Sequence, residues 1–406
     1  MAETVLLIGT FDTKGEEFAF VRDQIEANGC STLLMDIGVL EDPDITSDIP
    51  AEEVAKAGGS SLAQLRREAD RQQAFEVMTK GIKELTPRLF EEGKFDGVLS
   101  LGGGSGTMMA TAAMRELPLG VPKLMVSSVA SGDISAYVDI KDLTFMYSVA
   151  DIAGLNRLTR NILANAAGAV CGMVQRQQVD QEDKPLIAAT MFGVTTPCVT
   201  RVRKRLEEAG YEVVVFHATG TGGRTMELMI REGLVTGVAD VTTTEWCDEV
   251  AGGFLSAGPD RLSAAGQAGI PQVVSCGALD MVNFLAPETV PERYGSRTFY
   301  KHTSTVTLMR TSPEECREIG KQIADKLNSA TGPVALMIPQ KGVSKIDKEG
   351  EAFFHPEANN ALFGSLREHI NNKVLLKELD LHINDKEFAD AIADQLLNFL
   401  KQQTKL

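Results

Sequence analysis

The sequence lacks several features that would assign a compartment or a metal site at once. Its six cysteines form no C-x-x-C pair, so neither a zinc knuckle nor a thioredoxin-type motif is present. His302, His355, His369 and His382 show no metal-ligand spacing, which leaves any metal ligands unassigned. No run of about 18 apolar residues occurs, and the N-terminus carries an acid where a secretory signal would need a base. We therefore expect a cytoplasmic protein with reduced thiols and no membrane contact.

Positive charge is also scarce. Forty Lys and Arg residues stand against 56 Asp and Glu, which gives a formal net charge of −16. This balance opposes binding to nucleic acid or to an anionic membrane. It permits a small anionic ligand, because backbone N–H groups at a helix N-terminus hold phosphate even on an acidic protein. With 406 residues the chain exceeds one ordinary core, so two domains are expected.

The chain contains an internal repeat. Residues 11–29 and 192–210 have the same length, begin with phenylalanine and end with glycine ahead of an apolar run. Two later segments recur in the same order, residues 95–101 with 235–241 and residues 120–126 with 269–274. Repeated strand–turn–helix units predict an α/β fold of two similar Rossmann-like, open parallel-sheet domains in tandem, with ligands at the carboxyl ends of the strands and an interdomain cleft.

The domain limits follow from composition. Residues 176–184 are the most polar stretch between periodic segments, so we place the first domain at residues 1–183 and the second at 184–406. Residues 40–60 predict a loop insertion or flap, and residues 61–90 one long helix. A last amphipathic helix over residues 388–400 is a candidate to pack back across the boundary.

The strongest local signal for a ligand lies between an apolar strand and a helix. Glycine lets a phosphate approach the backbone closely, and the helix start offers N–H donors. A companion loop follows the first strand, an acid ends the second strand, and a hydroxyl-rich loop follows the fourth. Together they predict a nucleotide site made of Gly9, Thr10, Asp12, Thr13, Lys14, Asp36, Gly102, Gly103, Gly104, Ser105, Gly106, Thr107, Ser127, Ser128 and Gly132.

The companion loop is not a P-loop, because its lysine precedes the glycine. Lys14 is suited to contact a phosphate, and Asp12 to hold Mg²⁺ or a ribose hydroxyl. The simpler alternative makes Asp12 or Thr13 a helix N-cap and Lys14 a solvated side chain. For the glycine-rich loop, the alternative is a tight strand–helix turn without a ligand.

The second half keeps the scaffold and changes the side chains. His217 stands where the first half has Asp36, and Arg224 and Glu245 follow at strand ends, so these three are the candidate acid–base residues. A small-molecule substrate would contact Gly220, Thr221, Gly222, Gly223, Thr242, Thr243, Thr244, Cys276 and Gly277. A helix start beside Cys276 would lower the pKa of its thiol. The alternative is that Glu245 and Asp248 only cap a helix.

At these motifs the chain resembles a family related to the N-terminal ATP-binding domain of the tomato mosaic virus resistance protein. The matching runs are GTFDTKGEE (9–17), LSLGGGSGT (99–107), FHATGTGGR (216–224), DVTTTE (240–245), SAGPDRL (256–262), GALDMVNF (277–284), TVPERY (289–294), TLMRT (307–311) and HIND (382–385). The resemblance implies two Rossmann-like subdomains, ATP binding in the first, and self-association into homodimers or larger homo-oligomers.

Three functions remain open at this point. The first is a nucleotide-dependent enzyme that uses ATP with Mg²⁺ on a small anionic metabolite at the interdomain cleft. The second is a non-catalytic module in which ATP switches binding of a protein partner. The third is an ATP-independent hydrolase or lyase that acts on a sugar acid or lactone, with His217 and Glu245 as acid and base.

Overall fold

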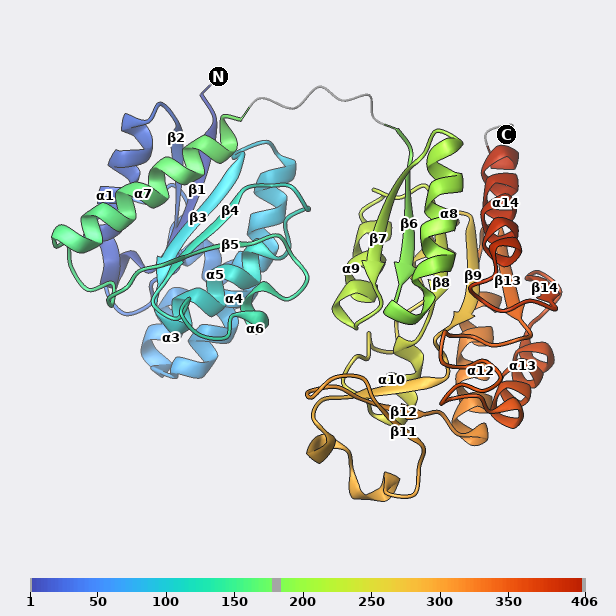
Figure 1. The fold of residues 1–406 in the computed structure, drawn as a ribbon. Coiled ribbons are helices and arrows are strands. Elements are labelled where there is room, and N and C mark those ends of the chain that lie inside the picture. The colour runs from blue at the N-terminus through green and yellow to red at the C-terminus, as the bar shows by residue number, and fades with distance from the viewer. Residues whose placement is uncertain (1, 177–183, 404–406) are drawn as a thin grey trace. The chain divides into compact units, whose positions relative to one another are not determined.

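The computed structural model describes residues 2–176 and 184–403 (Figure 1). Each of these two ranges belongs to a separate compact unit of the chain. The predicted boundary after residue 183 falls at the end of a segment outside the described residues. No helix in the described part of the chain combines the length and apolarity needed to span a membrane.

The first domain is built on a five-stranded parallel sheet with the order β2-β1-β3-β4-β5. Its strands are β1 (Thr4–Gly9), β2 (Ser31–Asp36), β3 (Gly97–Gly102), β4 (Lys123–Ser127) and β5 (Thr144–Tyr147). The central strands are continuous apolar runs, as expected for a parallel sheet that helices cover on both faces. Because side chains alternate along a strand, Val5 and Leu7 face one helical layer while Leu6 and Ile8 face the other.

Helices cover both faces of this sheet (Figure 1). α1 (Phe11–Ala27) and α7 (Arg157–Val174) share one core with Val5 and Leu7. α2 (Ala51–Ala57), α4 (Arg71–Glu91) and α5 (Gly104–Met114) share the other with Leu6 and Ile8. The short helices α3 (Leu62–Glu68) and α6 (Ser135–Val138) complete the domain.

The second domain repeats this topology. Its six parallel strands have the order β14-β13-β9-β8-β6-β7, so β7-β6-β8-β9-β13 corresponds to β2-β1-β3-β4-β5. The strands are β6 (Leu186–Met191), β7 (Glu212–His217), β8 (Gly237–Thr242), β9 (Gln272–Gly277), β13 (Val334–Pro339) and β14 (Leu375–Leu379). Gly97 pairs with Val5 in the first sheet, and Gly237 pairs with Ile187 in the second. The predicted pair of similar open-sheet domains is confirmed.

The second domain adds a small antiparallel sheet, β10-β12-β11, made of β10 (Met281–Phe284), β11 (Phe299–Lys301) and β12 (Thr307–Arg310). Its helices are α8 (Thr196–Glu208), α9 (Thr221–Arg231), α10 (Glu245–Ala251), α11 (Ala264–Ala268), α12 (Pro313–Asn328), α13 (Pro356–His369) and α14 (Lys386–Gln403), with short 3-10 turns η1 (Gly193–Thr195), η2 (Pro287–Thr289) and η3 (Glu292–Tyr294). The last helix, α14, packs Ile392 and Leu396 into the core that α8 shares with the second sheet.

Two local predictions need correction. The segment 40–60 is not all loop, because α2 lies within it and buries Val54 against α4. The helix predicted over residues 61–90 is broken into α3 and α4. Ala69 adopts φ 51°, which ends α3 in a left-handed residue, and the Asp70 carboxylate then caps α4 by accepting from the N–H groups of Gln72 and Gln73. The break places Arg71 at the first position of α4.

Candidate functional site

The carboxyl ends of β1 and β3 form the point where the first sheet changes winding direction. α1 leaves β1 on one face and α5 leaves β3 on the other, which opens a crevice between the two loops. The crevice holds a chamber of about 330 Å³, here called the glycine chamber. Its lining residues are Gly9, Thr10, Thr13, Lys14, Ile37, Arg71, Ser100, Leu101, Gly102, Gly103, Gly104, Ser105, Gly106, Met109 and Asp151.

The glycines of this loop are not explained by the packing of the chain itself. A Cβ added to Gly104 would meet no atom within 4 Å, and one on Gly103 or Gly106 would make only ordinary contacts. None of the three has a positive φ. Gly9 differs, because a Cβ there would lie 1.9 Å from the Phe18 ring. The open side of the loop therefore faces the chamber, where the first-turn N–H groups of α5 have no intrahelical partner.

Hydrogen bonds to α1 hold the segment after β5, which contributes Asp151 to the lining of the glycine chamber. The ammonium group of Lys14 donates to the carbonyl oxygen of Ile152. The N–H of Gly154 donates to the buried Glu17 carboxylate at 2.6 Å. These two contacts hold the segment after β5 against α1 and leave Asp151 in the chamber wall. Lys14 itself has non-helical backbone angles, φ −135° and ψ 26°, which kink the first turn of α1.

A second, larger chamber of about 620 Å³ adjoins the first and is mostly apolar; we call it the apolar chamber. Six residues line both chambers: Thr10, Thr13, Ile37, Arg71, Ser105 and Met109. Its other lining residues are Asp12, Val39, Leu40, Leu65, Arg66, Ala69, Asp70, Ala74, Phe75 and Met78. A polar, glycine-lined space beside an apolar one suits a ligand with an anionic end and a less polar body.

The structure places the predicted nucleotide-site residues in different settings. Nine line the glycine chamber (Gly9, Thr10, Thr13, Lys14, Gly102, Gly103, Gly104, Ser105 and Gly106), and Asp12 lines the apolar one. Thr107 and Ser127 are buried and share a 2.6 Å hydrogen bond. Ser128 and Gly132 lie in the loop after β4, outside both linings.

Asp36 acts on the protein's own backbone. Only 2% of it is exposed, and one carboxylate oxygen accepts from the N–H groups of Phe11 (3.1 Å) and Gly38 (2.9 Å). Burial raises the pKa of this carboxyl, while the two backbone donors oppose the rise. Asp36 thereby fixes the turn from β1 into α1, and it lies outside the lining of both chambers.

In the second domain the N-terminus of α9, which follows β7, is already occupied by a carboxylate. Glu245 is 1% exposed and accepts from the N–H groups of Gly220 at 2.9 Å and Gly223 at 3.0 Å. Its other oxygen accepts from the Nε of Arg261 at 2.6 Å. The glycine-rich entry to α9 therefore binds the chain's own anion. Burial raises the pKa of Glu245, and Arg261 opposes that shift.

Arg261 is the centre of this cluster and was not anticipated from the sequence. It is 1% exposed and contacts three buried carboxylates: Asp240 at 2.5 and 2.7 Å, Glu245 at 2.6 Å and Glu227 at 3.4 Å. Glu227 also accepts from the N–H groups of Leu262 and Ala264. The cluster joins β8, α9, α10 and the segment before α11.

In the second domain, unlike in the glycine chamber, close packing within the chain itself requires the glycines. A Cβ on Gly223 would lie 2.4 Å from the Glu245 carboxylate, and one on Gly222 would lie 1.8 Å from the carbonyl oxygen of His217. Gly220 has φ 79°, and a Cβ there would lie 2.7 Å from the carbonyl oxygen of Ser256. A Cβ on Gly277 would lie 2.3 Å from the carbonyl oxygen of Val241. These glycines permit close packing within the chain.

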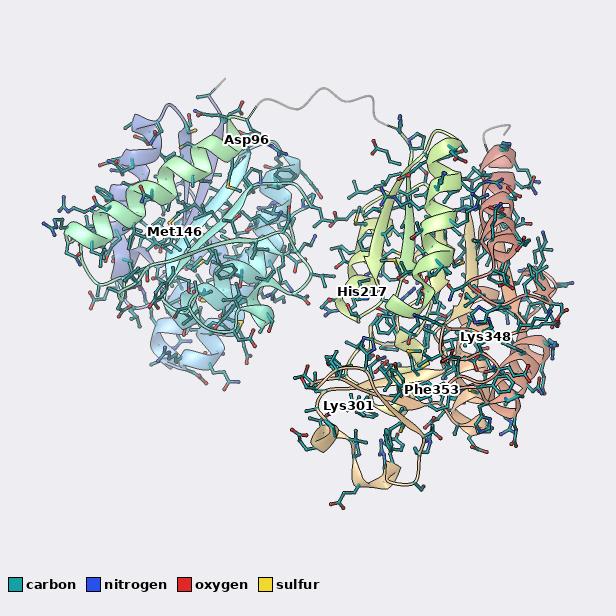
Figure 2. The ribbon with its side chains drawn as sticks, viewed as in Figure 1. Asp96, Met146, His217, Lys301, Lys348 and Phe353 are labelled. Atoms are coloured by element: carbon teal, nitrogen blue, oxygen red, sulfur yellow. The ribbon has the colours of Figure 1, made fainter. Side chains whose placement is uncertain are left out.

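The remaining second-domain candidates divide into accessible and buried residues. His217 is exposed at the carboxyl end of β7, where Figure 2 labels it, and its ring lies 5.3 Å from that of Phe192. Thr221 and Arg224 follow on the first turns of α9. Thr242, Thr243 and Thr244 are fully buried. For Cys276 the predicted direction was wrong, because complete burial raises the pKa of its thiol.

The geometry defines a class of protein: a tandem pair of open α/β domains, of which the first has an accessible glycine-rich loop at its sheet crossover. Models of two domains of the Uncharacterised protein family UPF0261 match the chain, the N-terminal domain over residues 3–179 and the C-terminal domain over residues 184–400. The chain belongs to this family.

Relatives of this chain occur in bacteria and plants. A UPF0261 protein of Clostridium tetani is 53% identical and covers 99% of this chain and 100% of its own length. UPF0261 protein RA0729 of Rhizobium meliloti is 49% identical over 95% of this chain and 96% of its own length. The ToMV resistance protein Tm-1(GCR237) of Solanum lycopersicum is 37% identical over 97% of this chain, which corresponds to 55% of the tomato protein. The resemblance noted from the motifs is confirmed.

Solved structures give only distant matches. A UDP-N-acetylglucosamine 2-epimerase is 12% identical with a TM-score of 0.25 and covers 68% of this chain and 79% of its own. Acinetobacter baumannii MurG is 12% identical with a TM-score of 0.24 and covers each chain completely. Scores this low establish neither a shared overall arrangement nor a shared activity.

Proposed function

We propose that the first domain binds a nucleotide, ATP with Mg²⁺, through its phosphates in the glycine chamber. The observation that carries this proposal is the set of three glycines, Gly103, Gly104 and Gly106, which neither packing nor backbone angles require. A phosphate pressed against the start of α5 supplies the missing reason, since only glycine permits that approach. α5 has eleven residues, long enough for its dipole to favour the anion.

The chamber also supplies side chains suited to the phosphates. Ser105 and Thr13 offer hydroxyl donors in the wall shared with the apolar chamber. Lys14 brings a positive charge beside them, held in place by the carbonyl of Ile152. The apolar chamber, with Phe75 and Met78 in its lining, has the volume for a nucleoside.

The residues present fit a magnesium ion that arrives with a nucleotide. Within the described residues no group of three or more His, Cys, Asp or Glu side chains forms a metal site by itself. Mg²⁺ commonly binds through one or two carboxylates together with substrate phosphates. Asp151 lies in the chamber wall and would hold the ion there, where it would neutralise phosphate charge. A carboxylate in an anion chamber is unfavourable unless a cation lies between it and the phosphate.

The second domain supports a coarser proposal. Glu245 is committed to Arg261 and to two backbone N–H groups, so acid–base work there would fall to His217, with Arg224 nearby on the first turns of α9. Under this proposal the chain is a nucleotide-dependent enzyme, and a small anionic metabolite is its second ligand. Dimers or larger homo-oligomers remain part of the proposal on the strength of the family resemblance.

The decisive experiment is a calorimetric titration of the full chain with ATP, with and without Mg²⁺, on wild type, Gly104→Val and Gly168→Val. Gly168 lies exposed on α7, and a Cβ there also meets no atom within 4 Å. We expect wild type and Gly168→Val to bind ATP with Mg²⁺ and Gly104→Val to bind at least tenfold more weakly. Equal ATP affinity in all three proteins would contradict the phosphate assignment.

Phosphate release separates catalysis from switching. Turnover of bound ATP that rises with an organic acid or sugar acid supports the enzyme, and His217→Ala should then lower that turnover without weakening ATP binding. Stoichiometric ATP binding without phosphate release across a broad panel of such metabolites would instead identify the switched, non-catalytic module.

A further inference from the structure

Two arginines, five positions apart, line the apolar chamber, and the protein itself uses only one of them. The guanidinium of Arg66 donates to the carbonyls of Val39 (3.1 Å) and Glu41 (2.8 Å) and to the carboxylate of Asp42 (2.8 Å). Arg66 therefore holds the chamber wall. The side chain of Arg71 is exposed and forms no hydrogen bond, ion pair or ring contact with any residue in the ranges 2–176 and 184–403.

The chamber wall around Arg71 is already fixed without it. The Asp12 carboxylate accepts from the N–H of Leu40 at 2.8 Å, and a Cβ on Gly38 would lie 2.5 Å from that carboxylate. Arg66 contacts the same segment through Val39, Glu41 and Asp42. Neither the wall nor the start of α4 depends on the guanidinium of Arg71, so this exposed group is available to a ligand in the chambers that it lines.

The position of Arg71 is also electrostatically unfavourable for a cation. It is the first residue of α4, a 21-residue helix whose N-terminus carries the positive end of the helix dipole. No acidic residue occurs within the first turn of that helix. The cap residue Asp70 directs a carboxylate oxygen to the N–H groups of Gln72 and Gln73 instead. A cation at the positive end of a helix is favourable when an anion lies next to it.

Arg71 stands at the junction of the two chambers. It lines the glycine chamber together with Ser105 and the apolar chamber together with Phe75. A ligand that fills both spaces must pass this residue where its anionic part meets its apolar part. A guanidinium fork matches the geometry of a phosphate through two parallel N–H donors.

We propose that Arg71 is a phosphate-binding residue that contacts the ligand where its phosphates join its less polar body. This inference rests on the proposed nucleotide site and names one of its specificity residues. The fitting ligand class is a compound with at least two phosphates attached to a nucleoside-sized body. Arg71 is the first residue of α4 because the helical segment is interrupted at Ala69 and Asp70. This interruption thus places the guanidinium in the lining of both chambers.

The test uses calorimetry on the full chain with three probes in the presence of Mg²⁺: ADP, inorganic pyrophosphate and adenosine. The variants are Arg71→Ala, Arg71→Lys, Gly104→Val and the control Arg67→Ala. Arg67 is exposed on α3 and lines neither chamber. We expect Arg71→Ala to bind ADP and pyrophosphate at least tenfold more weakly, with adenosine binding and thermal unfolding unchanged. Arg71→Lys should recover part of the loss, and Arg67→Ala should match wild type.

The outcomes separate the two proposals. If Gly104→Val loses ADP while Arg71→Ala stays within twofold of wild type, the role of Arg71 is overturned and the nucleotide site stands. An equal loss of adenosine binding in Arg71→Ala would also overturn it, because the residue would then shape the chamber instead of holding phosphate. If wild type binds neither ADP nor pyrophosphate, both proposals fail together.

Discussion

Removing one charge from the Arg261 cluster tests whether Glu245 anchors the second domain. In Glu245→Gln the side chain keeps its shape and one oxygen for the N–H groups of Gly220 and Gly223, but it loses its charge. The amide nitrogen of the glutamine then replaces the oxygen that accepts from the Nε of Arg261, so this hydrogen bond is lost and two donors face each other. Hydrogen bonds to charged groups contribute about 1.5–3 kcal/mol, so we expect a loss of about 2 kcal/mol in the free energy of unfolding.

Arg261→Met should cost more than Glu245→Gln. It leaves Asp240, Glu245 and Glu227 buried without their shared cation, and breaking a buried ion pair from one side costs about 3–5 kcal/mol. The matched control is Glu207→Gln, which removes an exposed i, i+4 pair with Arg203. Such surface pairs contribute about 0.3–0.5 kcal/mol.

The chain offers a built-in probe for this measurement. Its single tryptophan, Trp246, is buried beside Glu245 in α10, so tryptophan fluorescence during urea unfolding reports on the second domain. We expect the order of destabilisation Arg261→Met, then Glu245→Gln, then Glu207→Gln. If Glu245→Gln unfolds at the same urea concentration as wild type while turnover is lost, the anchoring role is refuted and the acid–base role gains support.

Three further predictions concern a buried acid, a close-packed glycine and a chamber lysine. Burial raises the pKa of Asp280 to about 7 from its usual 3.8, so Asp280 ionises at lower pH in the unfolded chain than in the folded protein. The contribution of Asp280 to the free energy of unfolding is therefore complete below about pH 4 and falls by up to about 4 kcal/mol by pH 7. In Asp280→Asn, urea unfolding at a series of pH values should show a smaller loss of stability over this range. Gly223→Ala should destabilise the second domain by about 1–3 kcal/mol through its clash with the Glu245 carboxylate, whereas Gly193→Ala, which meets no atom within 4 Å, should leave the fluorescence-detected midpoint nearly unchanged. Lys14→Met should weaken ATP binding at least tenfold in calorimetry, and unchanged affinity would assign Lys14 solely to the Ile152 carbonyl.

The sequence alone determined the architecture, because the signals involved are local and repeated. The apolar run at residues 5–8 predicts a buried strand, and the equal spacing of residues 11–29 and 192–210 predicts two similar units. The same local logic placed the glycine loop of residues 102–106 at a strand end, where the structure opens the glycine chamber. The limits of the helices in the first domain are harder to predict from the sequence, because the break between α3 and α4 depends on the single left-handed residue Ala69.

Only the tertiary structure decided what each charged residue near the strand ends contacts. Asp36 and Glu245 have the same sequence signature as ligand-binding acids, yet both accept backbone N–H groups inside the fold. The sequence predicted no role for Arg261 or Arg71. The side chain of Arg261 is enclosed by three carboxylates, whereas that of Arg71 has no partner in the described chain. The physical reason is that hydrogen bonding and desolvation depend on neighbours distant in sequence, whereas strand and helix formation depend mainly on neighbours along the chain.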